Sequence, residues 1–165
     1  MRDILFRGKR MDNGEWVGGD LIASNLISPD RNGELYINGK YVDGMVWGEG
    51  CFYCIDQSTI GQNTGLTDKN GVNIFEGDIV DLFGMKGKVV QECGAFGIGF
   101  MKTIDYDLLE SKIPFNNSAN FCFNDNFISL WKVFWNYEQD DNPLYEVEII
   151  GNIHDNPEML KGGDG

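Results

Sequence analysis

Apolar and polar residues alternate in short runs along most of the chain, and turn-forming residues separate these runs. Ile4 to Arg10 and Glu15 to Val17 flank Met11-Asp12-Asn13-Gly14, which has the composition of a hairpin turn. This pattern predicts two antiparallel strands at the start of the chain.

A second hairpin is predicted around Asn38-Gly39, between Leu35 to Ile37 and Lys40 to Val42. Asn-Gly supplies the two positive-φ residues that a type I′ turn requires. Met45 to Ile55 then reads as a further strand, interrupted at Gly48 to Gly50.

The segment Thr64 to Val80 contains two turn patterns and two strand starts. Asp68-Lys69-Asn70-Gly71 is typical of a tight turn, because Asp bonds its own backbone two residues on and Gly tolerates positive φ. Glu76-Gly77-Asp78 predicts a second turn, and the β-branched pair Ile79-Val80 opens a strand.

The chain from Gly77 onward has the pattern of a meander of short antiparallel strands. It predicts strands over Ile79 to Phe83, Lys88 to Glu92 and Ala95 to Met101, with turns at Gly84 to Gly87 and Cys93-Gly94. Such a meander resembles the entry into small SH3-like barrels. Barrels of that kind serve many functions, so this likeness indicates no activity.

The last third of the chain mixes helix and strand. Asp105 to Ser111 predicts about two helical turns with Asp105 or Thr103 as cap. Phe127 to Tyr137 is a dense aromatic run and predicts a strand, and Tyr145 to Asn152 alternates as a half-buried strand does. Asn156-Pro157-Glu158 predicts one further helical turn, with Asn156 as its cap.

A chain of 165 residues with 42% hydrophobic and 13% aromatic residues is expected to fold as one domain over 1–165. We expect amino-terminal hairpins over 1–60, and a barrel-like meander with a closing strand over 61–160. The predicted class is mainly β, of α+β character, with antiparallel hairpins and one or two short helices.

Three segments together resemble one known family. TGLTDKNG with IFEGDIV, FRGKRMDNGEWVGGDL near the start and EIIGNIHDNPEML near the end are similar to the patterns of the YopX family, small proteins carried by phages and prophages. The resemblance implies a phage-derived or prophage-derived accessory protein, without a catalytic residue or cofactor to carry over. Its signature residues here are Thr64, Gly65, Leu66, Asp68, Asn70, Gly71, Glu76, Gly77, Asp78, Gly151, Asn152, Asn156 and Pro157.

The formal net charge of −13 argues against nucleic-acid binding, because that binding uses Lys and Arg to replace phosphate counterions. Solubility explains this acidity more readily than mimicry of a nucleic acid does. Neither a membrane-length apolar run nor a signal-peptide core is present in the sequence, which predicts a cytoplasmic location in a bacterial host cell. The four cysteines are then expected to be reduced.

Two patterns invite a chemical interpretation. Cys51 and Cys54 have metal-ligand spacing, but Cys93 and Cys122 stand alone, so structural thiols without zinc or another cofactor are expected. His154 is the single histidine, and a small hydrolase or nucleotide-processing enzyme would pair it with a carboxylate such as Asp78. At Asp78 a turn-stabilising role is favoured.

Trp131, Phe134 and Trp135 form the densest aromatic cluster. If exposed, they suit a protein partner, because aromatic side chains dominate interface hot spots. The favoured hypothesis is therefore a non-enzymatic protein-binding module, with an unknown protein partner or a second copy of the chain. The alternatives are the enzyme, and a nucleic-acid reader on an SH3-like barrel, which the acidic charge disfavours.

Overall fold

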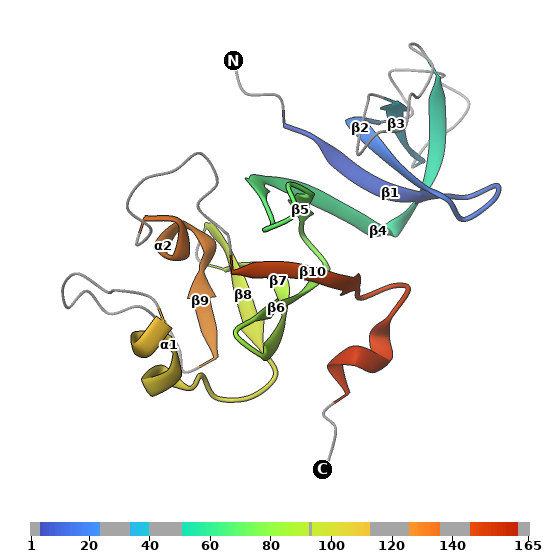
Figure 1. Cartoon of the computed structure of the whole chain (residues 1–165). Helices are drawn as coiled ribbons and strands as arrows, with labels where there is room; N and C mark the ends of the chain where they lie inside the picture. Colours follow the sequence, from blue (N-terminus) through green and yellow to red (C-terminus); the bar gives the residue numbers. More distant parts are fainter. Residues whose placement is uncertain are drawn as a thin grey trace. The chain divides into compact units, whose positions relative to one another are not determined.

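The computed structural model describes residues 4–23, 34–39, 51–92, 94–112, 126–135 and 146–161. The described residues form two five-stranded sheets and three short helical segments (Figure 1). The chain divides into two compact units, Met1–Asn63 and Thr64–Gly165. The prediction of a mainly β fold with short helices is confirmed.

The first sheet contains a closed ring of four strands. Its strands are β1 (Phe6–Arg10), β2 (Trp16–Ala23), β3 (Leu35–Gly39) and β4 (Phe52–Thr67), and β5 (Asn73–Phe75) is added beyond β4. Each of the first four pairs with the next, and β1 also pairs with β4, which closes the ring. Val17, Ile37 and Ile55 are buried together as a small core.

The second sheet has the strand order β10-β6-β7-β8-β9. Its strands are β6 (Asp78–Leu82), β7 (Met85–Glu92), β8 (Ala95–Phe100), β9 (Phe127–Ser129) and β10 (Val147–Asn152), and the helices are α1 (Tyr106–Lys112), α2 (Leu130–Trp135) and the 3₁₀ helix η2 (Pro157–Leu160). Val80, Val89 and Ile98 on one face of the sheet share a buried core with Leu109 of α1 and Val133 of α2. None of the helices in the described ranges has the length and apolar content that a bilayer-crossing helix needs.

The predicted β6–β7–β8 meander is present, but its first turn is shifted. Phe83 and Gly84 have φ of 56° and 85°, and Leu82 pairs with Met85, so the turn is a two-residue hairpin. The predicted turn over Gly84 to Gly87 is therefore wrong, because Gly87 lies inside β7. The predicted SH3-like relationship of this meander stays a prediction.

The hairpin predicted at Asn38-Gly39 is also wrong. Asn38 pairs with Asp20 of β2 and with Phe52 of β4, so it lies inside a strand that has neighbours on both sides. Pairing with two strands outweighs the local turn preference of the dipeptide. The predicted partner strand Lys40 to Val42 and the start of the strand from Met45 lie outside the described residues.

The strand predicted over Phe127 to Tyr137 ends after three residues. β9 stops at Ser129, and α2 begins at Leu130. Leu130 and Val133 are both buried, at the i, i+3 spacing that puts two side chains on one helix face. Tertiary packing of this face outweighs the strand preference of the aromatic residues, and Tyr137 lies outside the described residues.

The two predicted helical segments, at Asp105 to Ser111 and at Asn156 to Glu158, are confirmed, but the predicted cap of the second is wrong. Asp105 Oδ1 accepts a hydrogen bond from the Leu108 backbone N–H at 2.9 Å and so caps α1 as expected. Pro157 begins η2, but Asn156 makes no side-chain cap bond to it. Its Oδ1 instead accepts the backbone N–H of Asn152 at 3.3 Å.

Candidate functional site

The signature residue Asp68 is buried, with 1% of its surface exposed, and its carboxylate holds a turn to a strand. Oδ1 accepts hydrogen bonds from the backbone N–H groups of Asn70 at 2.8 Å and Val72 at 2.9 Å. Oδ2 accepts the backbone N–H of Ile149 in β10 at 3.2 Å. One side chain thus joins the turn over 68–72 to a strand from the other end of the chain.

Lys69 adds two further links between this turn and β10. Its backbone N–H donates to the Val147 carbonyl at 2.9 Å, and its Nζ lies 2.6 Å from Glu148 Oε2. The hydrogen bond that Lys69 Nζ donates to Glu148 raises the pKa of Lys69. The turn therefore occupies the outer edge of β10, which would otherwise present unpaired backbone groups.

The second signature turn is closed by Asp78, which is also buried. Asp78 Oδ2 accepts the Phe75 backbone N–H at 2.8 Å. Gly77 has φ of 85°, and it donates to the Val89 carbonyl and accepts from the Ile153 N–H, each at 2.9 Å. This is the geometry of a turn-stabilising carboxylate, and it leaves Asp78 almost no exposed surface for a substrate.

The third signature segment forms a compact turn after β10. Asn152 Oδ1 accepts the backbone N–H groups of His154 and Asp155, both at 2.9 Å. A Cβ at Gly151 would lie 2.7 Å from Asn156 Oδ1, so a side chain at this position would displace Asn156. The His154 side chain is half-buried in this turn.

The remaining signature residues also shape the backbone or the core. Thr64 Oγ1 donates to the Ile74 carbonyl at 2.9 Å, and Leu66 packs against the core of the second sheet. Gly65 and Gly71 both have φ of 78°. Asp78 pairs with Asn152 in the β6–β10 register, so signature residues far apart in sequence lie side by side. The contacts given above for these signature residues are with backbone groups, with the core and with one another.

Of the three predicted binding aromatics, the structure describes one side chain, that of Trp131. Trp131 is 57% exposed on α2. Phe134 and Trp135 lie in the same helix, and their side chains are outside the described part of the structure. Of the cysteines, Cys51 is exposed and Cys54 half-buried, both as free thiols, and Cys93 and Cys122 are outside the described residues. Within the described ranges, no three His, Cys, Asp or Glu side chains gather as metal ligands would.

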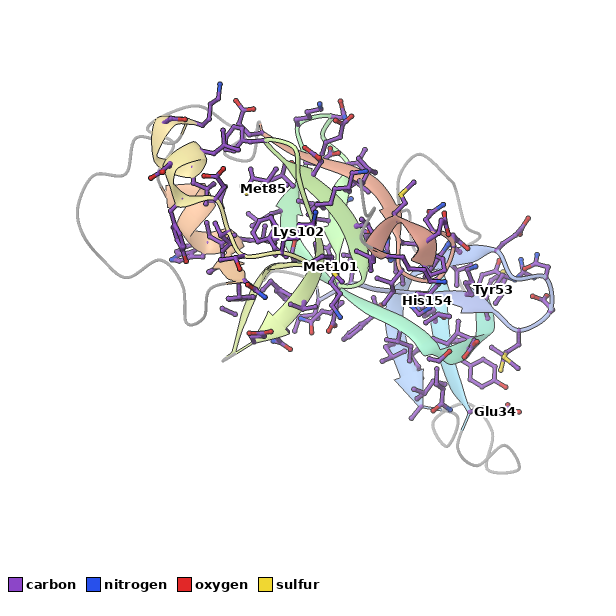
Figure 2. All side chains as sticks on the ribbon, turned by 90° about the horizontal axis from the view of Figure 1, so that it is seen from below. Glu34, Tyr53, Met85, Met101, Lys102 and His154 are labelled. Carbon is purple, nitrogen blue, oxygen red and sulfur yellow. The ribbon has the colours of Figure 1, made fainter. Side chains whose placement is uncertain are left out.

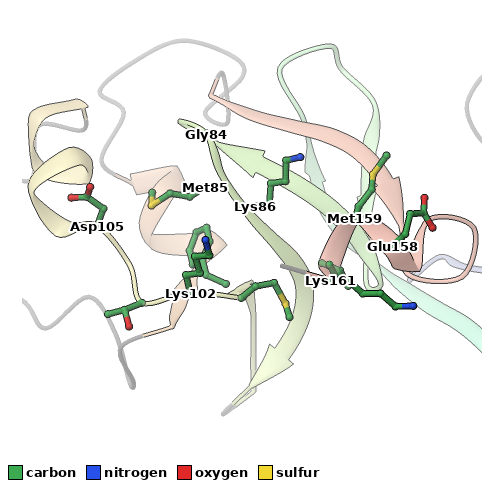
Figure 3. Close-up of a pocket in the computed structure, with 12 residues that line it drawn as sticks. Gly84, Met85, Lys86, Lys102, Asp105, Glu158, Met159 and Lys161 are labelled. Atoms are coloured by element: carbon green, nitrogen blue, oxygen red, sulfur yellow. The ribbon is translucent and has the colours of Figure 1, made fainter. Parts of the chain in front are cut away.

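A candidate site lies elsewhere in the second unit, in a pocket of about 560 Å³. It is formed by residues 84–86 at the β6–β7 turn, by 100–103 and Asp105 at and after the end of β8, and by 158–161 in and just after η2 (Figure 3). We name it the lysine–methionine pocket after the side chains that define it: Met85, Lys86, Met101, Lys102, Met159 and Lys161. Met85, Met101 and Lys102 are also marked on the whole chain (Figure 2).

This pocket combines apolar surface with positive charge. Met101 is 49% and Met159 37% exposed, so both offer apolar surface to a ligand. The unit from Thr64 onward contains seven lysines, no arginine and seventeen acidic residues, yet three of these lysines line one pocket. Two acids, Asp105 and Glu158, also line it, and Asp105 already accepts the α1 cap bond. The pocket therefore combines apolar lining with one more lysine than acidic residues, in a unit that is acidic as a whole.

The sequence analysis missed this pocket because no local pattern marks it. Its three lysines are separated by 16 and 59 positions in the sequence, and each stands among unrelated residues. Only the packing of η2 against β7 brings Lys161 toward Lys86.

Comparisons with known proteins bear on the family and leave the site open. The model of the family described as YopX protein matches residues 5–161. A solved structure, the crystal structure of protein EF1440 from Enterococcus faecalis, is 21% identical, and the match covers 97% of this chain and 99% of that chain, with a TM-score of 0.44. No curated protein matches the chain.

Proposed function

This chain belongs to the YopX protein family, and we propose that it is a non-enzymatic protein-binding module whose lysine–methionine pocket takes an apolar anchor from a partner protein. The proposal extends the accessory role that the sequence resemblance implies. The observation that carries it is the gathering of Met85, Met101 and Met159 from three separate segments around one opening.

Methionine suits such a surface. Its unbranched, polarizable side chain adapts to partners of different shape, and exposed methionines recur at promiscuous binding surfaces. Phe100 and Leu160 add apolar lining, and the volume lies within the range of ordinary binding pockets. The lysines around the opening favour partners with negative charge near the anchor.

The enzyme alternative has less support. It requires an accessible carboxylate near His154, and the proposed carboxylate of Asp78 is 1% exposed and bonded to the Phe75 amide. A general base must reach a substrate proton, directly or through one water molecule. Burial inside a turn does not favour that role.

The nucleic-acid alternative also has less support. Trp16, at the start of β2, is a side chain of the type that stacks on bases. Arg7 and Lys9 already lie over its ring, at 4.9 Å and 5.5 Å from the centroid. These contacts cover ring surface that a base would need, and the net charge of −13 opposes a phosphate backbone.

Met159→Asp tests the pocket. Peptides selected by the chain from a displayed library of random peptides should bind the variant at least 30-fold more weakly, since a hot-spot anchor contributes about 2 kcal/mol. Met11→Asp is the matched control, because Met11 is 67% exposed and does not line the pocket. Unchanged binding by Met159→Asp, measured by fluorescence anisotropy, would refute the proposed pocket.

Trp131 is proposed as a second anchor outside the pocket. Trp131→Ala should lose the proteins that the chain captures from a bacterial lysate, identified by mass spectrometry. Its free energy of unfolding should change by less than about 0.5 kcal/mol, because the side chain is 57% exposed. Capture that is identical to that of the unmodified chain would remove Trp131 from the proposed interface.

A further inference from the structure

A second pocket of about 570 Å³ adjoins the lysine–methionine pocket on the same sheet. The two pockets share Phe100, Met101 and Thr103 as lining residues. The second pocket continues along β7 past Lys88 to Glu92 and reaches Phe127 at the start of β9. The two pockets are therefore adjacent, and we call them together the groove.

A glycine in β8 leaves space on the floor of the groove. Gly99 of β8 pairs with Lys88 of β7, so both positions face the same side of the sheet. A Cβ at Gly99 would lie 3.3 Å from Val90 Cγ2, and glycine leaves this space open. Because the residue opposite Lys88 is a glycine, no side chain fills the groove at this position.

Two lysines of the groove lie at alternate positions of β7. Lys86 and Lys88 are exposed while Gly87 and Val89 between and beyond them are buried, so the two lysines project from one face of β7. Alternate residues on one strand face lie about 6.8 Å apart, which is also the spacing of alternate side chains in an extended peptide. Two carboxylates at alternate positions of such a peptide would match these two ammonium groups.

Four lysines and three acidic residues line the groove, and this small excess of positive charge favours an acidic occupant. The groove lysines are Lys86, Lys88, Lys102 and Lys161, four of the seven lysines from Thr64 onward. Among the residues that the structure describes, none of them forms an ion pair with a carboxylate.

The nearby acids are partly engaged. Asp105 caps α1, and Asp81, which pairs with Lys86 in the β6–β7 register, accepts the Gly84 backbone N–H at 2.8 Å. Glu92 and Glu158 also line the groove. The groove lysines can therefore bind anionic groups of a partner.

We propose that the groove binds an extended acidic segment of a partner protein, with its apolar anchor in the lysine–methionine pocket and alternate carboxylates on Lys86 and Lys88. This inference rests on the proposed function and adds the chemistry and course of the partner segment. A peptide is favoured over a phosphate polymer because Met101, Phe100 and Val90 give the groove an apolar wall.

Peptides that bind the chain are selected from a displayed library of random peptides of about ten residues. A peptide of this length spans roughly 33 Å when extended. The selected peptides should contain acidic residues at alternate positions beside an apolar residue. A synthetic peptide of the selected sequence should bind Lys88→Glu about tenfold more weakly at low salt, with a smaller difference at high salt, since such ion pairs are screened. Lys112→Glu is the matched control, because Lys112 is exposed and lines neither pocket, and it should change the affinity less than about twofold.

A second test exchanges the charges between the chain and the peptide. Lys88→Glu should prefer the same peptide with lysine at the alternate acidic positions, which reverses the preference of the unmodified chain. Selection of neutral or basic peptides, no effect of Lys88→Glu, or tighter binding of single-stranded oligothymidylate than of the peptide would overturn the inference. If Met159→Asp weakens binding and Lys88→Glu does not, only this inference fails. If Met159→Asp leaves binding unchanged, the proposed function fails.

Discussion

Asp68→Ala should lower the free energy of unfolding by about 3 kcal/mol or more, because three backbone N–H groups lose one carboxylate acceptor. Each buried donor left without a partner costs about 1–3 kcal/mol. The Asn70 and Val72 N–H groups close the turn, and the Ile149 N–H ties it to β10. Urea unfolding followed by circular dichroism measures the loss.

The matched control is Asp81→Ala. Asp81 also accepts a backbone N–H, from Gly84, but this bond lies in an exposed turn, so we expect a loss of less than about 1 kcal/mol. Asp68→Asn should fall between the two variants, because an amide keeps one acceptor but places N–H donors where Oδ2 stood. Equal stability of Asp68→Ala and Asp81→Ala would contradict the structural role of Asp68.

Gly97→Ala should lower the free energy of unfolding by about 3 kcal/mol, because β8 and β9 would have to separate. A Cβ at Gly97 would lie 2.2 Å from Phe127 Cζ and 2.5 Å from the Ile128 carbonyl oxygen. Overpacking of this kind typically costs 1–3 kcal/mol, and about 3 is expected where backbone must move. Thermal unfolding followed by near-ultraviolet circular dichroism, which reports on Phe127 packing, measures the effect.

Gly99→Ala is the control on the same strand face. Its nearest contact would be Val90 Cγ2 at 3.3 Å, the end of a side chain that has room to shift. We expect a loss of less than about 1 kcal/mol. A larger loss for Gly99→Ala than for Gly97→Ala would show that the β8–β9 pairing differs from that described.

Local turn chemistry was the part of the fold that the sequence predicted best. Gly71 and Gly77 adopt the positive φ that the two turns require, and Asp105 caps α1 as its position before the helix indicated. These features depend on a few adjacent residues, so a pattern in the sequence is sufficient to find them.

Features set by partners distant in the chain were predicted less well. Asn38 lies between two strands that the dipeptide itself does not specify. The aromatic run after Phe127 turns into a helix because Leu130 and Val133 pack into a core built largely from β6 to β8. In both cases contacts with residues distant in the chain outweighed local preference, by strand pairing at Asn38 and by burial at Leu130 and Val133.

The candidate site was beyond the reach of the sequence for the same reason. Its lysines and methionines stand in three segments, and each of them reads as an ordinary exposed residue until the β6–β7 turn, the segment after β8 and η2 come together. The signature residues, in contrast, stand out in the sequence and are used in turns and strand pairing. The prominent sequence patterns and the proposed binding site therefore fall on different residues.

Chemical-shift mapping tests this separation most directly. The chain is labelled with ¹⁵N, and a selected peptide is titrated into it while backbone amide signals are followed. We predict that the largest shifts occur at residues 84–86, 100–105 and 158–161, with small shifts at Asp68, Asp78 and Asn152. The largest shifts at those three signature residues, with none around the lysine–methionine pocket, would contradict the account.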